Sequence, residues 1–320
     1  MNVISLFDGC AMARVALDRA GFDVKTYLSC EVDKYAIKVA EKNWPMNIHM
    51  GDVTEFSIDN LEGNCDLLIG GSPCQDLSVA SPDRKGLEGA RSGLFWEYVR
   101  ILHEVKPKYF LLENVRMSKD NRDIISRELG VEPIEIDSAL FSAQTRKRLY
   151  WTNIPLGDLP EDKGVVLSDI LECQSTDYIK VAKRGTYKTK QHKASCLSGG
   201  AHSGGNHSDM DLIGVHKTKF NQPVEVGHAD DIKGHDFLRR VYSTWGKSPT
   251  LTTVSGGNQH RKVATSDYEY RRLTPTECER LQTLPDGYTE GVSNTQRYKM
   301  LGNGFTVDVI AWLLSGMKTT

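Results

Sequence analysis

The sequence predicts an α/β protein with a mostly parallel sheet and helices on both of its faces. In the first half of the chain, apolar runs of strand length alternate with segments whose apolar residues recur at helical spacing, which is typical of a doubly wound sheet. From about residue 172 to residue 260, Gly, Ser, His, Lys and Asn dominate and periodicity is weak. We therefore expect a smaller, irregular second domain, followed by helices that return to the first.

The expected elements follow in chain order. Strand-like runs cover residues 3–7, 25–30, 65–71, 109–114, 133–141 and 148–154, and one more strand is expected just before Asp52. Helical spacing covers residues 14–20, 33–43, 93–105, 274–285 and 302–317. Thr274, Pro275 and Glu277 form the pattern of a capped helix start. The last helix is expected to pack on the first domain.

Composition argues against several classes of protein. The 320 residues are 39% hydrophobic and 26% charged, which is ordinary for a globular chain. No apolar run approaches about 18 residues and the N-terminus lacks a secretory pattern, so we expect a cytoplasmic protein without a transmembrane helix. The seven cysteines include no C-x-x-C pair, which disfavours a zinc site or a disulfide framework, and no metal is expected.

Charge is unevenly distributed along the chain. The net charge is −2, but the stretch from Ser175 to Thr265 carries 14 Lys and Arg against 7 Asp and Glu, together with seven of the nine histidines. A local basic excess suits a surface that meets a polyanion, although a solvated basic loop fits the charge equally well.

Three short segments lie where strands are expected to end, which is where doubly wound sheets bind ligands. The first, "FDGCAMA", holds Phe7, Asp8 and Gly9, and its single glycine makes it a poor phosphate-binding loop. Glu31 is placed to accept the hydroxyls of a ribose, and Asp52 to accept a hydrogen bond from an adenine amino group. Together they predict a pocket for a nucleoside, without a loop that binds pyrophosphate. S-adenosylmethionine is a ligand that fits such a pocket.

Cys74 stands in "GGSPCQDLS", just past an apolar strand. A thiol there faces the ligand edge, and a thiolate is a good nucleophile, whereas an inert buried thiol is the plain alternative. "LLENV" places Glu113 and Asn114 at the end of another apolar strand. A carboxyl group in a dry pocket can keep a proton near neutrality and donate it.

"QTRKR" alternates Gln144, Arg146 and Arg148. In an extended chain these three side chains share one face. Two guanidinium groups on that face can hold a base carbonyl or a phosphate, although a basic surface strand is the reading for this motif alone.

The chain resembles the cytosine-5 DNA methyltransferase family in its motifs and their order. These motifs are FDG, Glu31, GD, GGSPCQ, ENV, QTRKR, TPTECERLQTLP and LGNG. The resemblance covers the catalytic part and the C-terminal helices, and it fades between about Ser175 and Trp245, where the family has its variable target-recognition domain. It implies a Rossmann-like S-adenosylmethionine-dependent methyltransferase sheet with a smaller irregular target-recognition domain. The expected domains are 1–172, 173–262 and 263–320.

Several stretches are similar to the eukaryotic de novo branch, while Pro-Cys-Gln at Cys74 is similar to bacterial members. The first motif has less glycine than is usual in the family. A prokaryotic or phage enzyme is therefore implied, as part of a restriction-modification pair or as an orphan.

The resemblance implies a mechanism in which the Cys74 thiolate adds to C6 of cytosine, Glu113 protonates N3, and Arg146 and Arg148 grip O2 and the thiolate region. C5 is then methylated, and the C5 proton and Cys74 leave. For the cofactor, the resemblance carries over Pro73 and Asn303 beside Phe7, Glu31 and Asp52, with Asn303 expected in a loop that opens the last helix. The target base must leave the duplex, at a cost of about a few kcal/mol.

Residues expected to contact double-stranded DNA fall in two groups. The Cys74 loop contributes Ser78, Ser81, Arg84 and Lys85, and the basic segment contributes Lys188, Lys190, His192, Lys193, Arg239 and Arg240. The rival functions are a tRNA cytosine-5 methyltransferase and a catalytically inactive nucleic-acid-binding relative. A monomer is the default expectation, a dimer through residues 94–105 is the alternative, and the target sequence is not encoded in any readable motif.

Overall fold

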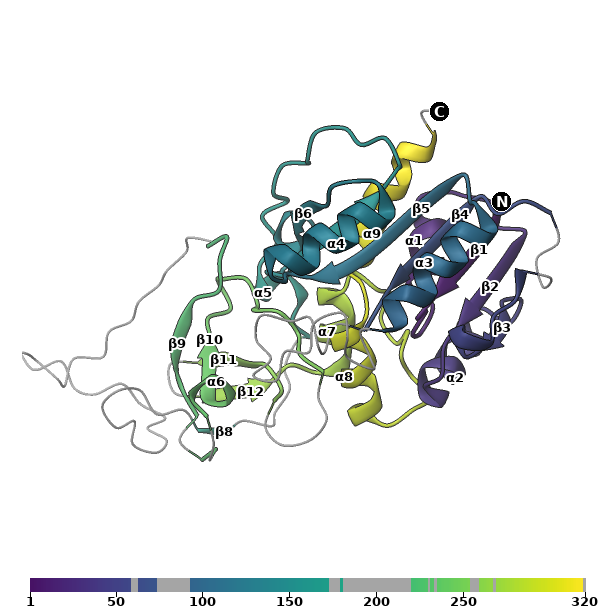
Figure 1. Ribbon diagram of the computed structural model, residues 1–320. Coiled ribbons are helices and arrows are strands. Elements are labelled where there is room, and N and C mark those ends of the chain that lie inside the picture. The colour runs from purple at the N-terminus through teal and green to yellow at the C-terminus, as the bar shows by residue number, and fades with distance from the viewer. Residues whose placement is uncertain are drawn as a thin grey trace, which may run out of the picture.

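The computed structural model describes residues 1–58, 63–73, 93–172, 179–180, 220–229, 231–232, 235–253, 259–266 and 269–318 (Figure 1). Within this part of the chain, the main sheet has seven strands in the order β3-β2-β1-β4-β5-β7-β6. Strands β3 to β5 in this order run parallel, whereas β7 is antiparallel to both β5 and β6. The strands are β1 (Asn2–Leu6), β2 (Thr26–Cys30), β3 (Ile48–Gly51), β4 (Leu67–Gly71), β5 (Tyr109–Val115), β6 (Ile134–Asp137) and β7 (Lys147–Thr152).

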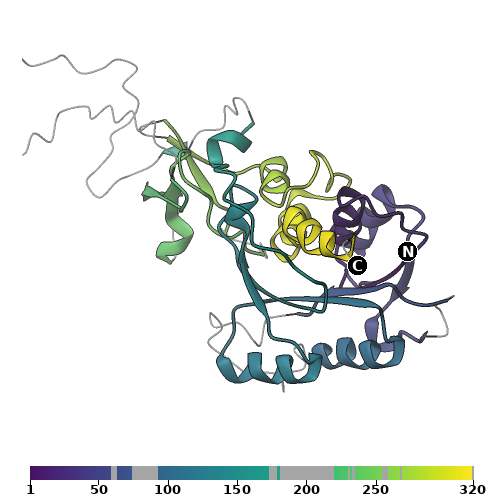
Figure 2. The same ribbon diagram turned by 90° about the horizontal axis from the view of Figure 1, so that it is seen from above.

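Helices cover both faces of this sheet, as the alternating pattern predicts. Helices α3 (Leu94–Val105) and α4 (Lys119–Leu129) lie on one face, and α1 (Met12–Arg19), α2 (Lys34–Asn43) and α9 (Val307–Ser315) lie on the other (Figure 2). Each face has its own apolar cluster. The central strands β1, β4 and β5 are buried on both faces, and for this reason they are near-continuous apolar runs in the sequence.

The C-terminal helices return to the main sheet, and α9 packs on α1, where Arg19 pairs with Asp308. Helix α7 (Pro275–Leu281) has the expected capping box, because Thr274 Oγ1 accepts from the Glu277 amide and Glu277 Oε2 accepts from the Thr274 amide. The expected helix over 302–317 is instead the end of α8 (Asn294–Asn303), a turn, and α9. The turn places Asn303 at the C-terminus of α8 rather than in a loop opening the last helix.

The stretch 294–318 is long and apolar enough to cross a membrane by length and composition alone, a test that a buried core helix also passes. It is broken between α8 and α9, and 61% of its most apolar window is buried inside the protein. This burial is what a core helix pair requires.

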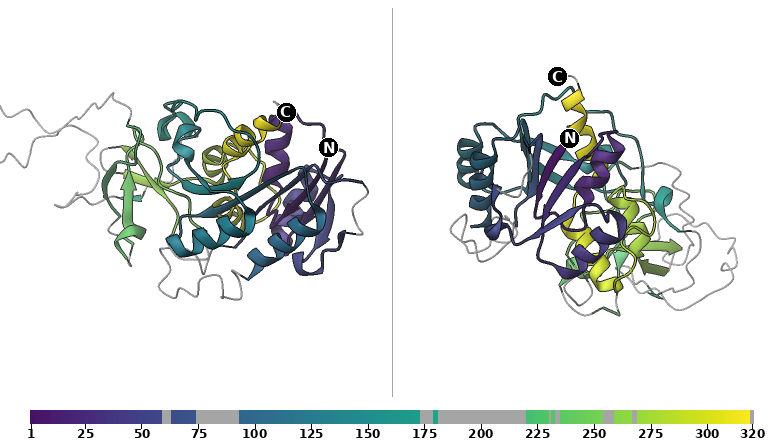
Figure 3. Two further views of the ribbon diagram at one scale, coloured as in Figure 1. Left: turned by 45° about the horizontal axis from the view of Figure 1, so that its top comes forward. Right: turned by 90° about the vertical axis from the view of Figure 1, so that its right-hand side faces the viewer.

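A second, smaller sheet stands at one end of the molecule, beyond α7 and α8 (Figure 1 and left panel of Figure 3). Its described strands have the order β8-β12-β11-β10-β9, with β10 and β11 parallel and the other pairs antiparallel. The short helices α5 (Leu167–Ile170) and α6 (Asp236–Arg239) lie in the same part of the chain. The strands are β8 (Ile179–Lys180), β9 (Glu225–His228), β10 (Arg240–Tyr242), β11 (Lys262–Ser266) and β12 (Glu269–Arg272).

The structure departs from the expected elements in four further places. Helix α4 was not predicted, and most of the strands in the second sheet are too short to show a period. The expected strand 133–141 ends at Asp137, whose carboxylate accepts from the Ala139 amide and starts a single 3-10 turn at Ser138–Leu140. The second sheet extends past residue 262 through β11 and β12, so the expected segment 263–320 begins inside that sheet.

Candidate active site

The carboxyl ends of β1 and β2 meet at one edge of the main sheet, and a hydrogen bond joins the segments that follow them. The Gly9 amide donates to Glu31 Oε2 at 2.8 Å. The loop after β1 reaches this position through left-handed backbone at Phe7, Gly9 and Ala11, with φ between 57° and 61°. Left-handed backbone at non-glycine residues is costly and concentrates at functional sites. The predicted residues Phe7, Gly9 and Glu31 are thus brought together.

The Glu31 carboxylate accepts hydrogen bonds from three backbone amides at this edge, the first of which is that of Gly9. Its Oε1 accepts from the amides of Val32 and Asp33, both at 2.8 Å. Its own amide donates to the Gly51 carbonyl at the end of β3, directly before Asp52. Because an ionised carboxylate has about four acceptor positions, Glu31 keeps capacity for a ligand hydroxyl.

Asp52 caps the 3-10 turn Val53–Glu55. Its Oδ1 accepts from the Thr54 amide and from Thr54 Oγ1, both at 2.9 Å. The turn fixes the carboxylate beside the ends of β2 and β3. The Gly51 carbonyl, which accepts from the Glu31 amide, directly precedes Asp52, so Glu31 and Asp52 follow the ends of two adjacent strands.

Asp8 differs from the other acidic residues because its side chain points into the protein. Its Oδ1 accepts from Ser5 Oγ and Tyr27 Oη, each at 2.6 Å. Burial raises the pKa of Asp8 to about 7, and the Glu31 charge adds to this effect. Asp8 anchors the loop after β1 through its bonds with Ser5 and Tyr27. It also lines a small pocket together with Gly9 and Glu31. That pocket is lined by Asp8, Gly9, Ser29, Glu31, Ile37, Ala40, Glu41, Trp44, Asn47 and His49.

The chain leaves β4 through Ser72 and Pro73, towards Cys74. Asn114, on β5, is 1% exposed, and its Nδ2 donates to Ser72 Oγ at 2.9 Å and to the Ser72 carbonyl at 3.4 Å. These bonds hold the start of the Cys74 loop against β5. Cys74 itself, and the predicted DNA contacts Ser78, Ser81, Arg84 and Lys85, lie outside the described residues.

Glu113 is paired across the sheet with Arg148. The Arg148 Nε lies 3.0 Å from Glu113 Oε1, with side-chain exposures of 14% and 12%. Glu113 stands opposite Tyr150 in the β5–β7 register, so Arg148, two residues away on the same face, reaches it diagonally. Gly71 at the end of β4 makes room for this carboxylate, since a Cβ there would lie 3.1 Å from Glu113 Oε2 and 3.2 Å from the Phe305 ring.

Arg146 is oriented differently from Arg148. Its guanidinium, on a side chain whose residue is 3% exposed, donates to the carbonyls of Leu251, Gly302 and Gly304 at 3.0–3.4 Å. Gln144 accepts from the Leu251 amide at 2.9 Å. The alternation in QTRKR therefore does place Gln144 and Arg146 toward the C-terminal segments, whereas Arg148 pairs with Glu113. The Arg146 guanidinium thus joins the segment that leads into β7 to the turn between α8 and α9.

Asn303 ends α8, and its Oδ1 accepts a short hydrogen bond from Thr253 Oγ1. This bond links the C-terminal turn to the segment that comes from the second sheet. Gln282, Thr306 and Lys247 are buried polar residues around the same junction. None of the three was predicted as a functional residue, although Gln282 lies within the TPTECERLQTLP motif.

The basic residues predicted to meet DNA are divided by the structure. Lys188, Lys190, His192 and Lys193 lie outside the described residues. Arg239 donates to the Ala229 carbonyl, whereas Arg240 pairs with Asp236 and Glu225. These acidic neighbours lower the positive field that Arg240 offers to a phosphate.

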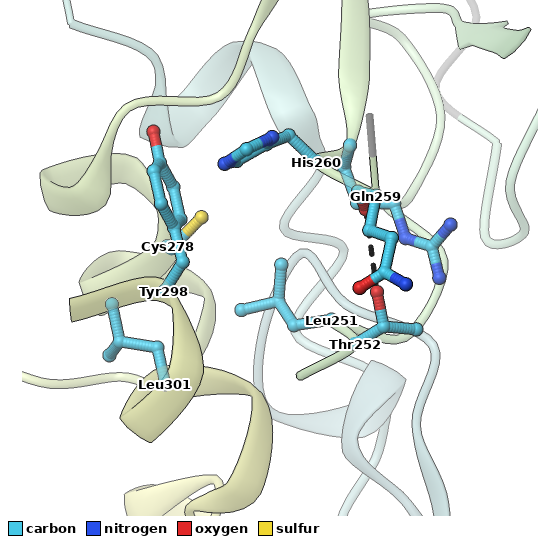
Figure 4. A pocket seen from close by; sticks show the side chains of 8 residues that line it. Leu251, Thr252, Gln259, His260, Cys278, Tyr298 and Leu301 are labelled. Carbon is cyan, nitrogen blue, oxygen red and sulfur yellow. Dashed lines mark hydrogen bonds between the residues drawn. The ribbon is translucent and has the colours of Figure 1, made fainter. Parts of the chain in front are cut away.

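A further pocket lies between the second sheet and the C-terminal helices (Figure 4). The His260 ring meets the Tyr298 ring edge-on at 4.5 Å, and Thr252 Oγ1 donates to the Gln259 carbonyl at 3.4 Å. Burial, with Arg272 and Lys262 nearby, lowers the pKa of His260 to about 4. No residue predicted from the sequence lines this pocket. Its lining is Leu251, Thr252, Gln259, His260, Arg261, Cys278, Tyr298 and Leu301.

The described residues contain no group of three or more His, Cys, Asp or Glu side chains arranged as a metal site. What they do contain is a sheet with the strand order and mixed direction of α/β methyltransferases, a nucleoside-type acceptor pair at its carboxyl edge, and an acid–arginine pair beside it. This combination defines the methyltransferase class.

The family model for C-5 cytosine-specific DNA methylase matches residues 1–130 and 137–319, and the chain belongs to this family. It is an enzyme of the DNA cytosine-5 methyltransferase type, whose members use S-adenosylmethionine and act on DNA. The resemblance in the motifs is thereby confirmed, as is the fold class.

Relatives from bacteria and their phages match over nearly the whole chain. The type II methyltransferase M.FnuDI of Fusobacterium nucleatum is 28% identical over an alignment of 340 positions, which covers 100% of this chain and 95% of that protein. The orphan methyltransferase M.SPBetaI of Bacillus phage SPbeta is 26% identical over 435 aligned residues, covering 97% and 96% of the two chains.

Among solved structures, the Entamoeba histolytica methyltransferase EhMeth superposes with a TM-score of 0.68 at 16% identity, covering 100% of this chain and 98% of that one. The S. pombe Dnmt2 methyltransferase gives 0.61 at 17% identity, covering 98% and 97%. At these identities the superpositions show the shared fold.

Proposed function

We propose that this enzyme methylates C5 of a flipped cytosine in one short duplex DNA sequence, through a covalent bond between Cys74 Sγ and C6 of the base. The observation that carries this proposal is the Arg148–Glu113 pair at the end of β5, next to the end of β4. The chain runs from β4 through two residues into Cys74, and Asn114 ties that connection to β5. An acid and a guanidinium thus lie at the edge where the chain leaves β4 toward Cys74.

The residues at the ends of β1, β2 and β3 fit S-adenosylmethionine. A Cβ placed on Gly9 would meet no atom within 4 Å, so there is open space above the loop. Glu31 and Asp52 offer neighbouring carboxylates for a ribose and an adenine amino group. Phe7, Pro73 and Asn303 complete the proposed set, with Asp8 as the buried support of the loop. When bound, this cofactor supplies an electrophilic methyl group.

Each protein group has a separate task in this chemistry. The Cys74 thiolate forms a bond to C6, which makes C5 enamine-like and nucleophilic. Glu113 protonates N3 as that bond forms, so no negative charge is stranded on the ring. Arg148 lies against Glu113 and is placed to hold O2 of the same base. After C5 is methylated, loss of the C5 proton, cleavage of the Cys74–C6 bond and return of the N3 proton to the Glu113 carboxylate restore the aromatic ring.

The substrate is double-stranded DNA, and the second sheet with its basic neighbourhood is proposed as the reader of the target. C5 is inaccessible inside a duplex, so the base must be flipped out. We assign residues 173–262 to target recognition, with the remainder of β11 and β12 completing its sheet, and residues 1–172 and 273–320 to the catalytic part. Lys188, Lys190 and Arg239 are proposed to contact DNA, and Ser78, Ser81, Arg84 and Lys85 to approach its backbone near the flipped base. Arg240 is proposed to contact DNA as well, once its ion pairs with Asp236 and Glu225 are broken.

The enzyme is proposed to work as a monomer in the cytoplasm of a bacterium or a phage-infected cell, either beside a separate restriction endonuclease or as an orphan. Both kinds of methyltransferase occur among its relatives by name.

The test is bisulfite sequencing of plasmid DNA from cells that express the wild-type chain, with Cys74→Ala and Glu113→Gln in parallel. Methylation confined to one short motif and lost in Cys74→Ala supports the proposal and identifies the target. Methylation that survives in Cys74→Ala overturns the assigned nucleophile. Unmethylated DNA together with methylated tRNA would replace DNA by RNA as substrate, and no methylation of either would favour an inactive relative.

A further inference from the structure

Gln282 is a buried amide whose hydrogen bonds join α7 to the turn between α8 and α9. It is 0% exposed and follows the last residue of α7. Its Nε2 donates to the Leu301 carbonyl at 2.6 Å and to the Gly304 carbonyl at 3.4 Å. Its Oε1 accepts from Thr306 Oγ1 at 2.9 Å. One side chain thus grips both sides of the turn between α8 and α9.

The same amide reaches the QTRKR segment. Gln144 Nε2 donates to Gln282 Oε1 at 3.3 Å, and Gln144 is itself 0% exposed. Arg146, two residues further, donates to the carbonyls of Gly302 and Gly304 in the turn that Gln282 also holds. The two segments are therefore joined by a buried polar network in which Gln282 is central.

The turn between α8 and α9 presents residues to both parts of the proposed site. Asn303 belongs to the proposed cofactor set, and the Phe305 ring lies next to Gly71, which also adjoins Glu113. The turn has little room to move, because a Cβ on Gly302 would lie 2.5 Å from the Thr252 carbonyl oxygen. A small displacement of this turn would shift Asn303 and Phe305 together.

We propose that Gln282 is a positioning residue for methyl transfer, which acts through Gly304, Thr306 and Gln144 to hold the Asn303–Phe305 turn and Arg146 in register. The proposal rests on the cofactor role assigned to Asn303 under the proposed function. Gln282 lies behind the site and contacts neither substrate nor cofactor. An amide is required because it donates to two carbonyls and accepts from a hydroxyl at once. Glutamate lacks the donors, and methionine lacks both.

The test compares Gln282→Met and Gln282→Glu with wild type. We would measure the Kd for S-adenosylmethionine by calorimetry and kcat on the plasmid-derived target duplex, each normalised to folded protein. We expect the Kd to rise about tenfold in both variants and kcat to fall by a similar factor. Thr306→Val keeps the shape but removes the hydrogen bond to Gln282 Oε1 and the one that Thr306 Oγ1 accepts from Ser138 Oγ. It should raise the Kd about threefold, and it serves as the test if the glutamine variants do not fold.

Ile125→Ala is the control for stability alone. Ile125 is buried in the cluster on the opposite face of the sheet. It should lower the melting temperature while the Kd of the folded protein stays within twofold of wild type. A Kd and a kcat within twofold of wild type in folded Gln282→Met, or in Thr306→Val where that variant is needed, would overturn the positioning role. An Ile125→Ala variant that weakens binding as much as Gln282→Met would overturn it as well.

If the proposed cofactor role of Asn303 is wrong, the binding measurements give a different result. Wild-type protein that does not bind S-adenosylmethionine, or an Asn303→Ala variant that binds it as wild type does, would refute the cofactor assignment itself. Weakened binding in Asn303→Ala with unchanged binding in Gln282→Met refutes only the role of Gln282.

Discussion

Arg148 and Glu113 form an ion pair across two antiparallel strands, with 3.0 Å between Nε and Oε1 and with both side chains largely buried. The pair belongs to the one edge of the main sheet that also receives the chain leading to Cys74. Two charged side chains are tolerated in this buried position because each neutralises the other. The pair still leaves a carboxylate oxygen and guanidinium nitrogens that can bind a ligand.

Glu113→Gln tests the proton-transfer role. The amide keeps the size of the carboxyl group but cannot deliver its proton to N3, so we expect kcat to fall about 10²–10⁴-fold. The Kd for S-adenosylmethionine should stay close to wild type, because the proposed cofactor residues lie on other strands. Single-turnover methylation and calorimetry measure the two quantities. A kcat within threefold of wild type would remove Glu113 from the mechanism.

Gly71→Ala tests the close packing beside Glu113. The new methyl group would lie about 3.1 Å from the carboxylate and 3.2 Å from the Phe305 ring, so one of them must shift. We expect kcat to drop about tenfold, as small misplacements of reacting groups are costly. Gly157→Ala is the matched control, since its Cβ would meet nothing within 4 Å and its activity should match wild type.

Asp8→Asn tests the buried carboxyl under the first loop. The folded-state pKa of about 7 lies above the unfolded value near 3.9, so the folded protein retains the proton. The stability from this group is complete below about pH 4 and is lost as the pH rises through about 7. Asparagine accepts the same hydrogen bonds without a charge. Relative to wild type, Asp8→Asn should therefore gain roughly 3 kcal/mol between pH 4 and pH 8 in urea unfolding, and a pH-independent difference would contradict this assignment.

His260→Phe tests the opposite pH dependence. The folded-state pKa of about 4 lies below the unfolded value near 6.5, so unfolding takes up a proton between these pH values. The stability from this group is complete above about pH 6.5 and is lost as the pH falls through about 4. The difference in unfolding free energy between wild type and His260→Phe should shrink by roughly 1 kcal/mol over that window, since solvent screens part of the effect. Urea titrations at pH 4.5, 5.5 and 7.5 measure it, and a growing difference at acid pH would be the wrong sign.

Glu277→Gln tests the start of α7. Glu277 is 0% exposed, and its two oxygens lie 2.6 Å and 2.5 Å from the guanidinium nitrogens of Arg271. Removing one charge of a buried pair leaves the other uncompensated, so we expect a loss of about 3 kcal/mol in the free energy of unfolding. Glu128→Gln, in the exposed pair with Arg127, should change it by less than about 0.5 kcal/mol. Equal losses in the two variants would refute the buried-pair argument.

Local pattern predicted much of the first domain because each of its elements is long enough to show a period. The apolar runs of β1, β4 and β5 are buried on both faces, and α3 shows helical spacing over twelve residues. The strands of the second sheet have two to five residues, so no period forms, and their pairing depends on contacts far apart in the chain. Helix α4 was missed because its apolar residues are few and its exposed face is strongly charged.

The sequence by itself determined the class of fold, the family, and the order of the chemical groups, because motif residues at strand ends are carried to one edge by parallel pairing. Only the tertiary structure decided what each arginine of QTRKR does. Arg146 and Arg148 are two residues apart, yet one holds three backbone carbonyls of the C-terminal segments and the other pairs with Glu113. Their partners come from segments up to 158 residues away. Alternation along a strand gives the face on which a side chain lies, whereas the groups that meet it there depend on how distant segments pack.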